Sequence, residues 1–331
     1  MLRNKNTKRF INWFFGPVLF LWLCYSIYTQ VAHQPHLEQS WQHIKQSLSA
    51  HKVGILIGVL LLMLLNWSVE ALKWNLSVAM IYPTTFLAAF YAVLSGVSLS
   101  VSMPNRMGEY AGRVLYLPEG SRLKAVPVSL VGSISQLLVT LVAGIAGLLF
   151  LKKALLHSYF INGVWYYVLL SGTVIATAVL MVFYFGIGTW RVWLQRWLRN
   201  SRHAYLLQSL HLFGASLLLR LLSLSFIRYI IFSLQYVLLF SFFEVHVATY
   251  LVWSVTAVLF LAMAAIPTIA LAELGLRGQL SLQLMGLFTK NSLGVVLTSV
   301  TAWAVNLVVP ALAGSILILT INVFKRKHEV V

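Results

Sequence analysis

One short stretch of this chain, Met103–Arg113, carries residues that could do chemistry inside a membrane. It holds a proline, two glycines, one carboxylate and two guanidinium groups, those of Arg106 and Arg113, directly after an apolar run. Guanidinium groups bind phosphate oxygens in a bidentate manner. Charges and free backbone polar groups are costly in hydrocarbon, so such a segment is tolerated there only where it faces protein or water. This first motif therefore indicates a site rather than apolar scaffolding.

A looser version of the pattern, the second motif, occupies Ile266–Gly278. Both motifs contain a proline followed by Glu-x-x-x-Arg, as Glu109 to Arg113 and as Glu273 to Arg277. Residues four apart lie on one face of a helix, so each pair can form an ion pair. The alternative is that both segments are ordinary loops between spans and that the four-residue spacing is coincidental.

The elements that must position these motifs are membrane helices. The chain has 331 residues, of which 60% are hydrophobic and 9% charged, and its mean hydropathy is +0.85, far above that of soluble domains. We predict an all-α integral membrane protein, a single polytopic domain over residues 1–331, with about eight spans near the roughly 20 residues that cross a bilayer. The predicted spans are Phe10–Val31, Val53–Met80, Thr84–Met103, Leu123–Leu151, Val164–Gly186, Leu212–Phe243, Thr249–Ile266 and Leu293–Val323.

The two interrupted segments between spans, Pro104–Arg122 and Pro267–Lys290, decide the topology. Basic residues cluster at the N-terminus, in Arg191–Arg202 and in Lys325–Lys327, and the positive-inside rule places all three in the cytoplasm. These anchors lie on the same side of the membrane only if the number of crossings between them is even. The predicted spans meet this condition only if each interrupted segment also changes side, as a further crossing or as a broken, re-entrant helix. This arrangement places Lys152 and Lys153 outside, against the rule.

The same assignment makes the two motifs enter the membrane from opposite sides. Such geometry is typical of an inverted repeat, here with halves of about 53–187 and 212–323. Broken helices at corresponding positions of two halves mark the substrate site of many transporters. We therefore expect the two motifs to meet near the middle of the membrane.

Two further arginines lie inside an apolar span, Arg220 and Arg228, and Gln235 shares the face of Arg228. They could bind phosphate oxygens, or they could neutralise Glu109 or Glu273 within the protein, and the sequence leaves both open.

A second group of polar residues, Asn66, Glu70 and Lys73, occupies one face of the second span at spacings of four and three. We interpret Glu70 and Lys73 as a structural ion pair that snorkels to the membrane surface.

Several classes of function are disfavoured. The net charge of +17 comes from 24 Lys and Arg against seven Glu and no Asp, and its clustering at span ends indicates anionic lipid rather than nucleic acid. Phosphotransferases hold divalent cations through carboxylates, and the chain has no paired acids in a short motif, no phosphate-binding glycine loop and no nucleophile elbow. His33, His36, His43 and His51 lack a metal-ligand spacing. We expect no enzyme, no cofactor and no metal site.

The motifs resemble the flippase-like transmembrane region of the lysylphosphatidylglycerol synthase family over most of the chain. The residues that carry the resemblance are Pro104–Glu109 with Arg113, the polar group Ser133–Gln136, and Pro267 followed by Glu273–Arg277. The resemblance implies translocation of an aminoacylated phosphatidylglycerol. The Ser133–Gln136 segment replaces an acidic element that is usual in the family, which puts a shared ion-coupling role in doubt. We expect a stand-alone form without the soluble aminoacyl-transferase domain, so the resemblance does not imply lysyl transfer.

These observations predict a translocase for an anionic phospholipid or a polyprenyl-phosphate-linked envelope intermediate, located in the inner membrane with both termini cytoplasmic. One alternative is a membrane accessory subunit that binds a lipid for a cell-envelope transferase, and another is a transferase in its own right. The candidate substrate-binding residues are Arg106, Glu109, Arg113, Arg220, Arg228, Glu273 and Arg277.

Overall fold

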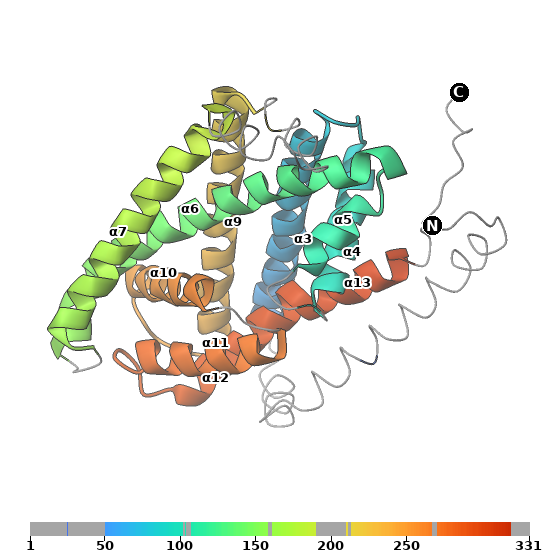
Figure 1. The fold of residues 1–331 in the computed structure, drawn as a ribbon. Coiled ribbons are helices and arrows are strands. Elements are labelled where there is room, and N and C mark those ends of the chain that lie inside the picture. Colours follow the sequence, from blue (N-terminus) through green and yellow to red (C-terminus); the bar gives the residue numbers. More distant parts are fainter. Residues whose placement is uncertain are drawn as a thin grey trace.

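The computed structural model describes residues 25, 50–101, 103, 107–157, 161–189, 210, 213–266 and 270–318. Within these ranges the regular elements are helices (Figure 1), as the composition predicts. Five of them are long and apolar enough to cross a membrane, over Lys52–Val78, Glu119–His157, Gly163–Phe185, Ala215–Phe242 and Ser292–Ile318. The chain therefore has the architecture of an all-α, multi-pass membrane protein.

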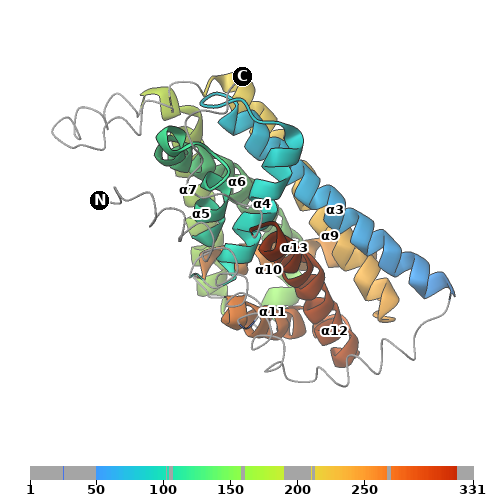
Figure 2. The same cartoon turned by 90° about the vertical axis from the view of Figure 1, so that its right-hand side faces the viewer.

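Two long helices, α3 (Ala50–Val78) and α9 (Ala215–Phe242), pack side by side and antiparallel (Figure 2). The start of α3 therefore contacts the end of α9, and later residues of α3 contact earlier residues of α9. The Nζ of Lys52, at the start of α3, lies 2.7 Å from the carboxylate of Glu244, just after α9. Farther along α3, Asn66 accepts a hydrogen bond from Arg228. This pair of helices brings polar residues 150 or more positions apart into direct contact.

The first motif forms the return arm of a tight helical hairpin. Helix α4 (Phe86–Ser100) runs into the turn and the short α5 (Gly108–Val114) comes back along it. Glycines permit the close approach, because a Cβ on Gly112 would lie 2.4 Å from the Cα of Gly96, and one on Gly108 would lie 2.3 Å from the backbone of Leu99. The two backbones touch without intervening side chains, which fixes α5 against α4.

The remaining helices are α6 (Glu119–His157), α7 (Gly163–Phe185), α10 (Thr249–Ala265), α11 (Ala270–Met285) and the last helix, which comprises α12 (Ser292–Trp303), η3 (Ala304–Val308) and α13 (Val309–Ile318). The last helix contains a π-turn, η3, two residues before Pro310. A proline lacks the N–H that an α-helix needs at that position, and such irregular turns absorb the mismatch.

Two interfaces connect early helices with late ones. Helix α13 packs on α4, and a Cβ on Gly314 would lie 2.0 Å from the carbonyl oxygen of Leu94. Helix α10 packs on α6, and a Cβ on Gly147 would lie 2.8 Å from the carbonyl oxygen of Ser254. In each case the glycine lies on the helix that follows one motif, α13 or α6. The backbone that it contacts belongs to the helix that precedes the other motif, α4 or α10.

Of the eight predicted spans, Phe10–Val31 lies outside the described residues apart from Tyr25, and the other seven correspond to helices. Two of the seven, α4 and α10, are shorter than predicted, at 15 and 17 residues. Conversely, α6 extends to 39 residues and passes through Pro127 without a break. The interrupted segments contain the separate helices α5 and α11.

Candidate functional site

The carboxylate of Glu70 lies at the centre of a buried ionic cluster. Its Oε2 accepts from the Nζ of Lys73 at 2.8 Å and from the Nη1 of Arg228, and its Oε1 lies 2.8 Å from the Nη2 of Arg113. The side chain of Glu70 is 4% exposed. At about 1.5 Å per residue, Glu70 lies roughly 12 Å before the C-terminal end of α3. The cluster therefore sits inside an apolar span rather than at its end.

Arg228 reaches Glu70 from the facing helix α9. Its Nε donates to the Oδ1 of Asn66 at 2.9 Å, and its guanidinium lies 5.4 Å from the ring centroid of Trp67 and 5.8 Å from that of Phe232. Aromatic faces stabilise a cation that has lost water. Arg228 is thus held in place by an amide, a carboxylate and two rings.

Arg113 joins the cluster from α5. The same Nη2 that contacts Glu70 lies 3.1 Å from Oε2 of Glu109, one helical turn earlier. The Arg113 guanidinium also lies 5.9 Å from the ring centroid of Trp74. The first Glu-x-x-x-Arg pair therefore forms as its spacing predicts, and it is connected to a second acid, Glu70, that the spacing does not reveal.

Hydroxyl groups extend the cluster to α6. The Nζ of Lys73 donates to Ser225 at 3.4 Å, and the hydroxyls of Ser225 and Ser135 lie 2.8 Å apart. Ser135 belongs to the polar segment Ser133–Gln136. The cluster thus receives side chains from α3, α5, α6 and α9.

The second Glu-x-x-x-Arg pair has a different environment. The Nη2 of Arg277 lies 2.6 Å from Oε1 of Glu273, and its Nη1 donates to the hydroxyl of Tyr236 at 3.1 Å. Arg113 and Arg277 thus each bind the glutamate four residues before them and one residue of the helix pair formed by α3 and α9. For Arg113 that residue is the charged Glu70, and for Arg277 it is the neutral Tyr236.

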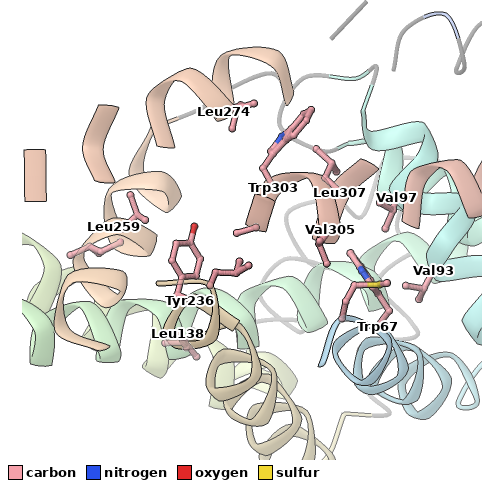
Figure 3. Close-up of a cluster of buried hydrophobic side chains, with 14 of the residues drawn as sticks. Trp67, Val93, Val97, Leu138, Tyr236, Leu259, Leu274, Trp303, Val305 and Leu307 are labelled. Carbon is pink, nitrogen blue, oxygen red and sulfur yellow. The ribbon is translucent and has the colours of Figure 1, made fainter. Parts of the chain in front are cut away.

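An apolar layer lies between Tyr236 and Trp67 (Figure 3). The side chains of Trp303 and Val305, on α12 and η3, occupy this layer and belong to the same continuous hydrophobic core. The contacts of the two arginines lead to different residues: Arg113 is linked through Glu70 to Arg228, whereas Arg277 bonds Glu273 and Tyr236. The joint site that we expected from the two motifs is not formed by these contacts.

The ion pairs of the first cluster contain more cations than carboxylates among the described residues. The cations Lys73, Arg113 and Arg228 contact two carboxylates, those of Glu70 and Glu109. Taking ions from water into a protein interior costs several kcal/mol each, and pairing is needed to offset this. Such a concentration of charged side chains is rare inside an apolar span.

Unused hydrogen-bond donors surround the same residues. The Nδ2 of Asn66, the Nε1 of Trp67 and the Nε of Arg113 are buried and lack a partner. Buried polar atoms are nearly always satisfied in proteins, and exceptions often mark functional positions. All three atoms are donors, so each of them could bind an acceptor.

The structure places the arginines that were predicted as site residues in different surroundings. Arg113 and Arg228 are buried and lie in one cluster. Arg220 is exposed on the surface of α9, so it is not part of the cluster. Arg106 lies outside the described residues.

Two interpretations from the sequence were wrong. Lys73 does not snorkel, because its side chain is 3% exposed and turned inward onto Glu70. Arg228 is neutralised by Glu70 and not by Glu109 or Glu273. A carboxylate in the middle of an apolar run was the available signal for Glu70, since such residues are functional by default. Nothing in the sequence pointed to Tyr236.

In the part of the chain that the structure describes, no group of three or more His, Cys, Asp or Glu side chains could hold a metal ion. Three of the four histidines of the predicted outer loop lie outside the described residues. Comparisons of the chain with protein-family models, with curated proteins and with solved structures find no match.

Proposed function

We propose that this protein translocates an anionic lipid across the inner membrane. The observation that carries the proposal is the Glu70 cluster, with three buried cations against two carboxylates. A cluster made for stability alone would gain nothing from so many buried charges, since apolar residues would cost less. An anionic headgroup would be attracted by this concentration of cations, because electrostatic attraction is strong in a protein interior. Lipid phosphates are the anions available at this depth.

The packing of the helices supports a repeat with halves of about 53–187 and 212–323. The order long helix, short helix, motif helix, long helix occurs twice, as α3-α4-α5-α6 and as α9-α10-α11 followed by the last helix. The first helices of the halves pack on each other, α3 on α9. The second helix of each half packs on the fourth of the other, as α4 on α13 and α10 on α6. This reciprocal pattern is what a two-fold relation between the halves would produce.

An inverted repeat is a common basis of alternating access, in which one part of a transporter rocks against another around a fixed site. In this proposal the termini and the Arg191–Arg202 loop are cytoplasmic, and the two motif helices enter from opposite sides. The resemblance to the flippase-like region of the lysylphosphatidylglycerol synthase family agrees with a lipid as the cargo.

Reconstitution tests this function directly. Purified protein would be placed in vesicles that contain headgroup-labelled phosphatidylglycerol or phosphatidylcholine, and the labelled lipid that crosses would be measured by quenching from outside. We expect faster crossing of phosphatidylglycerol than in protein-free vesicles, and little effect on phosphatidylcholine. Crossing rates equal to protein-free vesicles for both lipids would refute translocation. If phosphatidylglycerol copurified with the protein but did not cross, the accessory-subunit alternative would replace it.

A further inference from the structure

We infer that the π-turn η3 is a hinge in the middle of the last helix. The two arms of this helix, α12 before the turn and α13 after it, pack on different groups of helices. Bending at η3 lets these groups change their angle to each other. The inference concerns the motion of the fold, and it does not depend on the cargo that the protein carries.

The backbone hydrogen bonds of the last helix are interrupted at η3. The N–H of Val309 bonds the carbonyl oxygen of Ala304, five residues earlier, in place of the usual four. Pro310 follows with no N–H, so it cannot bond the carbonyl oxygen of Asn306. The Nδ2 of Asn306 donates to the carbonyl oxygen of Ala302 at 3.0 Å, and its Oδ1 is buried without a partner. Long helices kink at prolines and at π-turns, and π-turns are frequent at functional sites.

The turn lies far from either end of the span. The span covers Ser292–Ile318, and η3 begins at Ala304, roughly 18 Å from its start at about 1.5 Å per residue. Val305 and Leu307 are buried, and irregular backbone at membrane depth is tolerated where it is buried in protein. A bend at this position changes the direction of a whole arm, whereas a bend near one end would move only the last residues.

The first arm, α12, is anchored to the second half of the chain. It packs on α11, the helix of the second motif, and on α9. At its start, the Nδ2 of Asn291 donates to the carbonyl oxygens of Phe243 and Glu244, just after α9, at 3.2 and 3.3 Å. A Cβ on Gly294 would lie 2.9 Å from the same carbonyl oxygen of Phe243. These contacts with the backbone fix the start of α12 at the end of α9.

The second arm, α13, is anchored to the hairpin of the first motif. It packs on α4, where a Cβ on Gly314 would lie 2.0 Å from the carbonyl oxygen of Leu94. The carbonyl oxygen of Leu317 accepts a hydrogen bond at 3.5 Å from the hydroxyl of Tyr116, just after α5. Figure 2 shows α13 next to α4 and α12 next to α11. The last helix therefore connects the two motif regions, and η3 is the joint of this connection.

The joint itself is held by apolar packing in the part of the chain that the structure describes. The side chains of Trp303 and Val305 lie in the apolar layer between Tyr236 and Trp67 (Figure 3). Asn306 bonds within its own helix, and the Nε1 of Trp303 has no partner. Apolar contacts are not directional, so this layer can rearrange more easily than the backbone contacts of the two arms. Two anchored arms and an apolar centre are what a hinge between packed groups of helices requires.

Distances between spin labels test the hinge in the full-length protein. Cys24→Ser removes the single cysteine, and Leu293→Cys and Ile316→Cys place labels at exposed positions of the first and the second arm. Electron paramagnetic resonance then gives the distribution of distances between the labels in nanodiscs of dioleoyl phosphatidylcholine. A straight helix would hold these positions roughly 34 Å apart. The reference pair is Val164→Cys with Val182→Cys, at exposed positions of the unbroken helix α7.

We expect the distribution across η3 to be about twice as wide as that of the reference pair. Pro310→Ala restores the missing N–H, so it should narrow the distribution to the width of the reference pair. Pro127→Ala is the matched control, because Pro127 lies in α6 without a break. It should leave the distribution across η3 unchanged.

Three results would overturn the inference. The first is a distribution across η3 that is as narrow as the reference pair before any proline is replaced, and this comparison does not require Pro310→Ala to fold. The second is an unchanged width in Pro310→Ala. The third is an equal narrowing in Pro127→Ala, which would mean that the width does not arise at η3.

Discussion

The two Glu-x-x-x-Arg pairs share a spacing but differ in what surrounds them. Arg113 of the first pair joins Glu70, Lys73 and Arg228. Arg277 of the second pair binds Glu273 and the hydroxyl of Tyr236. The backbones differ as well, since α5 touches α4 glycine to glycine, while the glycines of α11 face open space. The first motif thus belongs to a larger ionic cluster, whereas the arginine of the second motif contacts a hydroxyl group beside its own glutamate.

The largest effect should come from removing the centre of the charged site. Glu70→Gln keeps the shape but leaves Lys73, Arg113 and Arg228 with one carboxylate, that of Glu109. Breaking a buried pair in this way costs about 3–5 kcal/mol. Chemical denaturation in detergent would measure it, with the exposed Glu119→Gln as a control that should change stability by about 0.5 kcal/mol or less. Equal stability of both variants would contradict a buried cluster.

The glutamates of the two motifs should differ in importance to stability. Glu273→Gln leaves the partly buried Arg277 with a neutral partner, at a cost of about 2–3 kcal/mol. Glu109→Gln should cost about 1 kcal/mol, because Arg113 keeps Glu70 and the side chain of Glu109 is already 20% exposed. Thermal melting of the two variants side by side gives the order. A larger loss of stability in Glu109→Gln than in Glu273→Gln would contradict this prediction. It would mean that Arg277, and not Arg113, is held by additional charged partners.

Alanine at one glycine of each motif helix tests the difference in backbone packing. Gly112→Ala places a Cβ 2.4 Å from the Cα of Gly96 and should destabilise by about 1–3 kcal/mol. Gly275→Ala meets nothing within 4 Å and should stabilise by about 0.5–1 kcal/mol through helix propensity. The folded yield and the melting temperature of the two variants would measure this difference in stability. A harmless Gly112→Ala would rule out the tight α4–α5 contact.

The smallest effect is expected at the exposed ion pair that ties the start of α3 to the end of α9. A hydrogen bond from Lys52, and then its charge, hold the pKa of Glu244 below its usual value. The pair therefore stabilises the protein above the unfolded pKa of Glu244, and the contribution is lost as pH falls through the folded pKa. Glu244→Gln should lower the melting temperature slightly at neutral pH and low salt, and not at all in acid or high salt.

The spacing of residues along the sequence predicted the contacts that form within a single helix. Both ion pairs within the motifs form, because residues four apart on a helix are neighbours whatever the rest of the fold does. The helical spans followed from apolar runs of the right length. Their ends were less accurate, as in α6, where the helix continues past Lys152 and Lys153 because charged side chains are tolerated at a membrane helix end.

The composition of the site depended on distant contacts that spacing does not encode. Glu70 and Arg228 are 158 residues apart and meet because α3 and α9 are antiparallel neighbours. Lys73 was expected to reach the surface, but the acid one turn before it faces α9, and the lysine follows it inward. The sequence contained the necessary clue, a carboxylate within an apolar run, but not the identity of its partners.

The glycine contacts of α4 with α13 and of α6 with α10 limit which helices can move independently in a conformational change. Each contact is backbone to backbone, so sliding or separation there would open a void that no side chain could fill. Any large motion that keeps these contacts must carry α4 along with α13, and α6 along with α10. Such a motion would therefore move helices from the early and the late parts of the chain as common units.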